Sequence, residues 1–218
     1  WEWICSDHFD EMAFSAEAKE AIARNPNITS PATPGTYGPP LQNVQTQPES
    51  QDDQVGDWVH MNSISYLGPN KWYDLGDERF HPENIIWDGR QTNHIAIIDK
   101  RTGKLVWQVG PEYTATEALR KLGQIIGQHQ AHMIPRGLPG EGNILVYDNG
   151  GRAGYGAPNP GAPTGLSHAR RDYSRVLEFD PITLEIIWQY TPLEAGFLGY
   201  EHASNFYSVS ISGVQRLP

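Results

Sequence analysis

The sequence is poor in cysteine, in basic residues and in long apolar runs. Cys5 is its one cysteine among 218 residues, so the chain cannot form an internal disulfide. Asp and Glu number 26 against 16 Lys and Arg, and the formal net charge of -10 argues against nucleic acid or an anionic membrane as a partner. No stretch of about 18 apolar residues occurs, so we expect no membrane span. No signal peptide is recognisable, and because the chain starts at Trp1 rather than at methionine, we expect both of its ends to be truncated.

Glycine, proline and aromatic residues are abundant, which predicts many short strands joined by turns. The sequence contains 22 Gly and 17 Pro, and aromatic residues make up 11% of it. Residues 94–109 and 174–190 share one pattern: a strand that ends in Asp, a turn that contains Thr, and a strand that ends in Trp-Gln and an apolar residue. The Asp side chain is suited to cap the turn by bonding to the backbone. Each segment is therefore predicted to be a β-hairpin, and residues 1–3 resemble the end of an earlier copy.

Further strand patterns follow the hairpins and predict an all-β fold of the β-propeller type. We expect third strands of blades at 59–67, 130–136 and 206–213, and fourth strands at 83–88 and 143–148. The repeat is longer than a propeller blade of roughly 40–50 residues, so we expect insertions. The chain then holds an incomplete set of about two and a half four-stranded blades, one full and two partial. Because a propeller must close its ring, we expect this set to belong to a larger propeller; the alternative is a complete β-sandwich with irregular loops.

Inserted segments interrupt this single partial propeller domain, which takes in all 218 residues. Residues 6–56 form a helix-plus-loop insert, with a helix predicted over 13–24 from its strong helix formers and a long surface loop over 26–56. A second short helix is expected within 116–126. Residues 150–171 are rich in Gly and Pro, and we expect them to form a loop that shapes or covers a neighbouring site.

Two histidines suggest a shared site. His60 and His129 each come just before the alternating part of a third strand, and equivalent positions in neighbouring blades converge because blades are arranged radially. Two imidazoles that meet are suited to bind an anion or to relay a proton near neutral pH; hydrogen-bonded structural histidines are the alternative. Asn62 is placed to orient His60, to bind an oxyanion or to shape the turn. His132 lies three residues after His129 and is expected on the opposite face of the strand unless a bulge intervenes.

Arginines add a second candidate cationic position. Arg90 and Arg152 each follow the Asp that ends a fourth strand. A guanidinium group offers a planar fork of donors suited to sulfate, phosphate or carboxylate, and a salt bridge to the nearby Asp is the alternative. No cofactor or metal is expected, since the sequence has no tight ligand spacing, no Gly-rich phosphate loop that leads into a helix, and no nucleophilic serine elbow.

Four motifs resemble the bacterial arylsulfate sulfotransferase family. They are Asp-Trp-x-His-x-Asn-Ser at 57–63, Gln-His-Gln-Ala at 128–131, Asp-Asn-Gly with a following Arg at 148–152, and Phe-Tyr-Ser-x-Ser at 206–210. The resemblance implies a six-bladed propeller of the periplasm or extracellular space, often a homodimer. It implies transfer of a sulfuryl group from a phenolic sulfate ester to a phenol, without a nucleotide donor, through a transiently sulfated histidine.

The resemblance also assigns roles to residues. It implies that His60, His129 and Arg152 are catalytic, and we expect Asn62 and Arg90, with His132, to contact the substrate. The family's sulfated histidine lies about one strand beyond the Phe-Tyr-Ser segment, so we expect the nucleophile after residue 218.

Two other functions fit parts of the sequence. One is a non-catalytic propeller that serves as a binding or scaffold module, in which the histidines are structural. The other is a quinoprotein-type dehydrogenase, suggested by the Thr-Gly-Lys-x-x-Trp hairpin at 102–107 alone. The dehydrogenase needs a quinone and a carboxylate cage for Ca²⁺, and the sequence does not offer such a cage convincingly.

Overall fold

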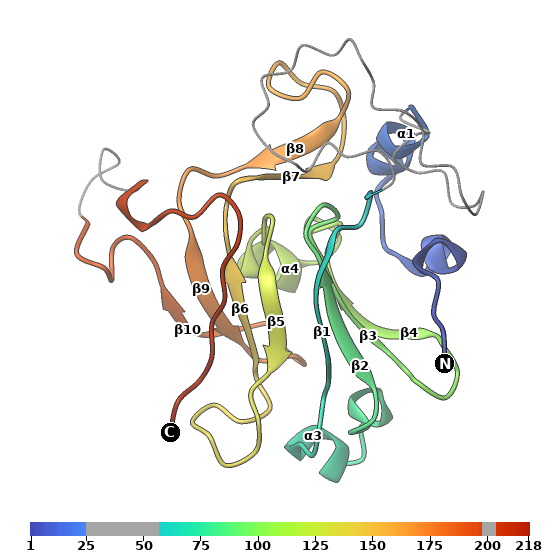
Figure 1. The fold of residues 1–218 in the computed structure, drawn as a ribbon, viewed down its shortest axis with the longest axis vertical. Helices are drawn as coiled ribbons and strands as arrows, with labels where there is room; N and C mark the ends of the chain where they lie inside the picture. The colour runs from blue at the N-terminus through green and yellow to red at the C-terminus, as the bar shows by residue number, and fades with distance from the viewer. Residues whose placement is uncertain (25–56, 198–203) are drawn as a thin grey trace.

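Two four-stranded antiparallel sheets make up most of the protein, and helices are few (Figure 1). The computed structural model describes residues 1–24, 57–197 and 204–218. The first sheet has the order β1 (Met61–Tyr66), β2 (Ile85–Gly89), β3 (His94–Ile98) and β4 (Leu105–Val109). The second sheet has the order β10 (Ile186–Tyr190), β9 (Arg175–Phe179), β6 (Ile144–Asp148) and β5 (His129–Met133). A separate two-stranded sheet consists of β7 (Arg152–Tyr155) and β8 (Leu166–Arg170).

The helices are short and lie outside the sheets (Figure 1). They are η1 (Cys5–Glu11), α1 (Ala16–Arg24), α3 (Lys71–Asp74), η3 (Glu78–Phe80) and α4 (Glu117–Leu122). The helices predicted within 13–24 and 116–126 are confirmed, and Thr116 caps α4 by accepting a hydrogen bond from the Leu119 N–H at 3.1 Å. The surface loop predicted at 26–56 lies outside the described residues. Among the helices of the described segments, none is long and apolar enough to cross a membrane.

The strands are grouped into sheets differently from the prediction. The expected hairpin at 94–109 forms as β3 and β4, but it completes the sheet that β1 and β2 begin, because β2 pairs with β3 across a short turn at 90–93. The second hairpin, β9 and β10, completes the other sheet in the same way. The structure therefore contains two complete four-stranded sheets, which corrects the expected count of one full and two partial blades.

Two of the predicted strands do not form. Residues 1–3 and 206–213 are described, and neither range is extended into a sheet. Within the second range, Ile211 has a φ of +60°, and the Ser208 hydroxyl lies 2.7 Å from the carbonyl oxygen of Ser210. A left-handed residue and a local side-chain hydrogen bond both interrupt an extended strand. The segment runs beside β5 instead (Figure 1).

The Gly/Pro-rich segment at 150–171 is more ordered than the predicted loop. It folds into the β7–β8 hairpin, and its loop is confined to the tip, where Asn159 and Ala162 form an isolated bridge. Ala153 of β7 and Ala169 of β8 pair with each other and pack against Ile126. These small apolar side chains give the hairpin a buried face, which explains why it holds a fixed place over the sheets.

The main hydrophobic core lies between the facing surfaces of the two sheets. The first sheet contributes Ile86, Ile95, Ile97, Trp107 and Val109, and the second contributes Met133, Ile144, Val146, Leu177 and Phe179. The outer face of the first sheet is covered by α1 and the segment before it, where Phe14 and Ile22 pack with Trp87 and Ala96. Because both faces of β3 are covered, all of its residues are buried, as in a near-continuous apolar strand.

The two sheets meet along β1 and β5, which lie side by side (Figure 1). At one end of these strands, residues 57–60, 89–93, 127–130 and 149–152 come together, and we call this end the rim. Hydrogen bonds join its parts: the Gly127 N–H donates to Asn93 Oδ1 at 2.9 Å. The β7–β8 hairpin lies over the rim (Figure 1), and the Gly154 N–H donates to the carbonyl of Gln91 at 2.9 Å.

Candidate functional site

His60 lies at the rim, in the turn that leads into β1. Its φ of +49° is left-handed, which is uncommon for a residue with a side chain. Its carbonyl accepts a hydrogen bond from the Arg90 N–H at 2.9 Å, and its Nδ1 lies 2.5 Å from Oδ2 of Asp57. Backbone and side chain are therefore both held, which fixes the imidazole against the end of β2.

His129 opens β5 and lies half-buried at the same rim. Its Nδ1 is 2.7 Å from Oδ1 of Asn149, and its Nε2 accepts a hydrogen bond from the Ile211 N–H at 3.3 Å. Burial lowers the pKa of His129 below its usual 6.5, the hydrogen bond to Asn149 opposes this, and the positive charges of Arg90 and His60 lower it further. The structure thus brings His60, Arg90 and His129 within electrostatic reach of one another.

The two histidines do not occupy equivalent positions, which corrects the prediction of one repeated position. In the second sheet, His129 pairs with Tyr147. At the same distance from the hairpin turn in the first sheet, Ser63 pairs with Asp88. His60 lies three residues before Ser63. Both first strands carry a bulge of one extra residue near the rim, so the bulges do not cause this difference. The two histidines therefore lie at different positions along their strands, on one rim.

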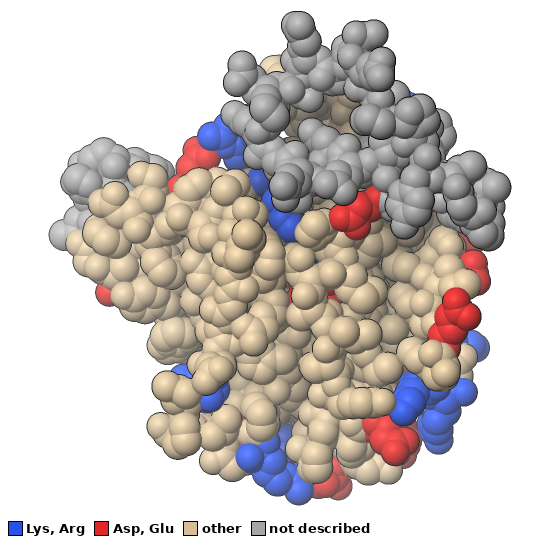
Figure 2. Space-filling model, in the orientation of Figure 1, with Lys and Arg blue, Asp and Glu red and all other residues tan. Residues whose placement is uncertain are grey.

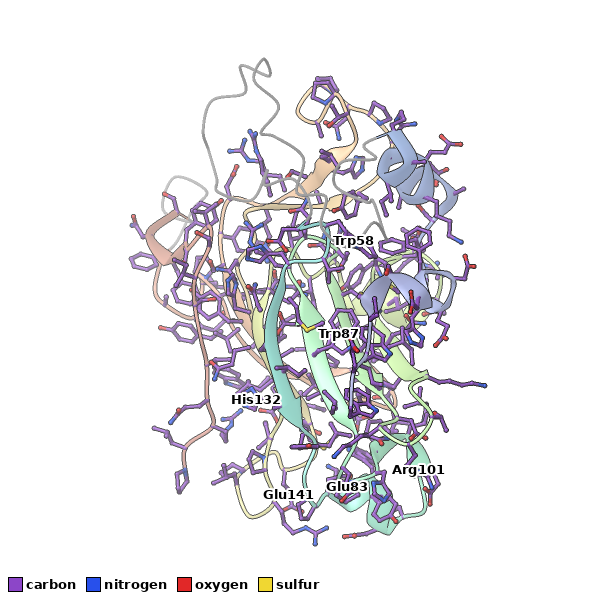
Figure 3. The ribbon with its side chains drawn as sticks, turned by 45° about the vertical axis from the view of Figure 1, so that its right-hand side comes forward. Trp58, Glu83, Trp87, Arg101, His132 and Glu141 are labelled. Carbon is purple, nitrogen blue, oxygen red and sulfur yellow. The ribbon has the colours of Figure 1, made fainter. Side chains whose placement is uncertain are left out.

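Asn62 and His132 have separate surroundings. The Asn62 amide Nδ2 donates to the Gln128 carbonyl at 3.0 Å and so ties β1 to the start of β5. A bulge in β5 lies between His129 and His132, so their spacing of three residues does not place them on opposite faces of the strand. His132 Nδ1 lies 2.9 Å from the Gln130 carbonyl, and Figure 3 shows His132 well below Trp58, which marks the rim. His132 therefore lies along the strands, away from the rim.

The two arginines lie in different elements. Arg90 is buried in the turn after β2. Its side chain lies close to Gly127: a Cβ atom added to Gly127 would be 3.9 Å from both Cγ and Cζ of Arg90. Arg152 is half-buried, begins β7 and pairs with Arg170. Burial raises the pKa of Tyr207, and Arg152 is among the charges that oppose this rise. The structure therefore places Arg90 beside the start of β5 and puts the charge of Arg152 within reach of Tyr207.

Sequence reasoning overlooked two carboxylates at the site. Asp57 contacts His60 as described above, and Asp88 is fully buried at the end of β2. Asp88 Oδ2 accepts hydrogen bonds from the Ser63 hydroxyl and from the Ala131 N–H, so it joins β1, β2 and β5. Burial raises the pKa of Asp88 to about 7, although these hydrogen bonds and the charge of His60 lower it. Asp57 carried a usable signal, because it stands three residues before a histidine in a loop.

The surface above the strands carries few charged side chains. Figure 2 shows an uncharged face over β1 and β5, with Lys and Arg side chains near the β7–β8 hairpin. Within residues 1–24, 57–197 and 204–218, no group of three His, Cys, Asp or Glu side chains is placed to hold a metal ion. The site therefore combines the Arg90 guanidinium and two histidines with the carboxyl groups of Asp57 and Asp88.

Comparisons with known proteins identify the family. A search of curated proteins and a search of solved structures each found no match. The model of the family described as Arylsulfotransferase (ASST) matches residues 1–218, which is the whole chain. This match agrees with the motifs at 57–63 and 128–131, which provide His60 and His129 at the rim. The chain therefore belongs to the arylsulfotransferase family.

Proposed function

We propose that the protein transfers a sulfuryl group from an aryl sulfate ester to a phenol, and that the rim binds the group in transfer. The observation that carries the proposal is the approach of Arg90, His60 and His129 to one another at the rim of a chain that belongs to this family. We place Arg152 at the edge of the same site and Asn62 as a further substrate contact, and we propose that His132, away from the rim, contacts a part of the substrate that extends along the strands.

The charges suit this reaction. An aryl sulfate monoester carries one negative charge on three oxygens, and negative charge also develops on the leaving phenolate. Donors that are fixed before the reaction stabilise such charge without reorganising. In the first step a histidine nitrogen attacks sulfur while the bond from sulfur to the phenolate oxygen breaks. In the second step the acceptor phenol oxygen attacks sulfur, the nitrogen–sulfur bond breaks, and the phenol proton passes to a base.

A chromogenic donor tests the proposal. Wild-type protein with para-nitrophenyl sulfate and a phenol acceptor should release nitrophenolate and form the new aryl sulfate in equal amounts. His60→Ala should lower kcat/KM for the phenol acceptor by about 100-fold, the scale of positioned proton transfer. His81→Ala is the matched control, because its ring lies at the turn before β2, at the other end of the sheets. Absence of turnover by the folded full-length gene product would exclude the enzymatic function.

One observation favours the alternative of a non-catalytic binding module. Both ring nitrogens of His129 are hydrogen-bonded, to Asn149 and to the Ile211 N–H, as in a structural histidine. A binding module should bind aryl sulfate without turnover, measured by calorimetry, and His129→Ala should leave that binding unchanged. In the enzyme, the Ile211 contact must open before His129 can donate to a sulfuryl oxygen, and His129→Ala should then weaken donor binding.

The architecture and setting of the whole protein are part of the proposal. The two sheets face each other across a core and meet along β1 and β5, as adjacent propeller blades do. We therefore propose that the chain is part of a β-propeller of a periplasmic or extracellular protein that forms homodimers. Cell fractionation and light scattering of the expressed gene product test the last two points.

A further inference from the structure

We propose that Asp57 is a positioning residue that holds His60 so that its Nε2 accepts the proton of the acceptor phenol. This inference rests on the proposed sulfuryl transfer and adds to it a residue that sets which acceptors react. The observation behind it is the 2.5 Å separation between Asp57 Oδ2 and His60 Nδ1.

The contact determines which ring nitrogen carries the proton. A carboxylate oxygen accepts hydrogen bonds, so the His60 Nδ1 must be the donor in this pair. In the neutral ring the lone pair then resides on Nε2, the nitrogen that can take a proton. The carboxylate also stabilises the imidazolium that forms when Nε2 becomes protonated. This is the role of the orienting acid in a carboxylate–histidine pair.

The loop that carries the pair is restrained at each residue. The Trp58 carbonyl accepts a hydrogen bond from the Tyr155 hydroxyl at 2.6 Å, and the Val59 carbonyl accepts one from the Gln91 N–H at 3.0 Å. Val59 itself is buried against the outer face of the first sheet. Such restraint is needed because the left-handed His60 backbone costs free energy that its surroundings must offset. The geometry of Asp57 and His60 is thus built into the fold.

Two further charged groups of the described residues act on His60 through their electrostatic field. Asp88 on β2 and His129 on β5 interact with it electrostatically. Asp88 directs its Oδ2 to Ser63 and Ala131 instead. Asp57 therefore contacts the ring directly, whereas Asp88 acts on it through the electrostatic field.

The step balances as a proton transfer coupled to sulfuryl transfer. The acceptor oxygen forms a bond to sulfur, the bond from sulfur to the sulfated histidine breaks, and the phenol proton moves to His60 Nε2. His60 then releases this proton to water or to the next departing phenolate. Nδ1–H stays bonded to Asp57 throughout, and no oxidant or reductant is needed.

Acceptors of graded acidity provide the test. Asp57→Asn should still release nitrophenolate in the first turnover with para-nitrophenyl sulfate, before an acceptor is added, because that leaving group needs no proton. Transfer to a weakly acidic phenol should slow by about 100-fold, and the loss should shrink steadily for more acidic phenols, which need less help from a base. Asp57→Glu should restore part of the rate. Asp74→Asn, an exposed carboxylate paired with Arg136, is the matched control and should act as wild type.

Two outcomes would overturn the inference in an active enzyme: an unchanged rate for Asp57→Asn with the weakly acidic phenol, or an equal loss for all phenols, which indicates a structural role. A folded full-length gene product without nitrophenolate release would overturn the proposed function and this inference together. Nitrogen NMR of the His60 ring gives a readout that does not depend on activity. We expect the proton on Nδ1 in the wild type, and a proton on Nε2 with a bare Nδ1 would refute the pairing.

Discussion

The buried carboxyl group of Asp88 should make the protein less stable as the pH rises toward neutrality. Its side chain is fully buried, and burial raises its pKa from the usual 3.8 to about 7. Between these values the folded protein holds a proton that the unfolded chain has released. Stability therefore contains a contribution that is complete below about pH 4 and is lost as the pH rises through about 7.

The size of the effect follows from the same values. A rise from 3.8 to about 7 corresponds to about 4 kcal/mol, of which about 3 kcal/mol should be lost between about pH 5 and about pH 8. Asp88→Asn removes the titration and keeps the contacts. With its amide oxygen in the place of Oδ2, the asparagine can accept both from the Ala131 N–H and from the Ser63 hydroxyl.

Urea denaturation at several pH values measures the difference. The unfolding free energy of the wild type should fall by about 3 kcal/mol more than that of Asp88→Asn over this pH range. Asp172→Asn, which changes an exposed carboxylate, is the control and should follow the wild type. Ser63→Ala removes a hydrogen bond that lowers the pKa of Asp88, so the loss of stability should shift to higher pH. An identical pH dependence of wild type and Asp88→Asn would refute the reasoning.

Three further predictions concern the core, a helix and the rim. Phe80→Ala should destabilise the protein by about 3–5 kcal/mol in chemical denaturation, because the ring is fully buried against Trp72 and Trp107. Thr116→Ala should cost about 1 kcal/mol by removing the cap of α4, whereas Thr116→Ser should cost little. NMR titration of the His129 ring should give a midpoint below 6.5, since burial disfavours its charged form, and a midpoint above 6.5 would contradict the half-buried position.

Local features of the fold were predictable because their causes lie close together in the sequence. The Asp residues that end the predicted hairpin strands do cap the turns: Asp99 accepts from the Arg101 N–H at 2.8 Å, and Asp180 accepts from the Ile182 N–H at 2.7 Å. The α4 helix likewise follows from its cap and its helix formers. The family resemblance is also confirmed, because the motifs that carry it are short and contiguous.

The grouping of strands into sheets follows from the lengths of the connections between strands, which the hairpin pattern does not show. The turn at 90–93 is short, which favours antiparallel pairing of the strands on either side of it. The connection from β4 to β5 is much longer and contains α4, which favours a boundary between sheets there. Weighing the lengths of these connections would have placed the hairpin at 94–109 with the strands before it.

The positions of the site residues along the strands could not be read from the sequence, because they depend on how each first strand pairs with its neighbour. His60 lies six residues before Tyr66, which pairs with Ile85, whereas His129 lies four residues before Met133, which makes the corresponding pair with Ile144. The partners of Arg90 were equally hidden, since its place beside Gly127 depends on how two sheets meet. Only the pair of Asp57 and His60 combined a short separation in sequence with a loop that could bring them together.

The two ends of the sheets differ in a way that itself points to function. At the end opposite the rim, polar side chains form hydrogen bonds with backbone groups. Asn70, for example, accepts hydrogen bonds from the Trp72 and Tyr73 N–H groups, both at 3.1 Å. At the rim, His60 and Gln130 both hold left-handed backbones, and a carboxyl group is buried with a pKa near neutrality. Each of these features costs stability, and although Leu184 at the opposite end is also left-handed, the carboxyl group with a raised pKa lies at the rim. Because they gather where the family motifs meet, the rim is where we expect the chemistry, and Asp57→Asn is the variant that should separate positioning from structure there.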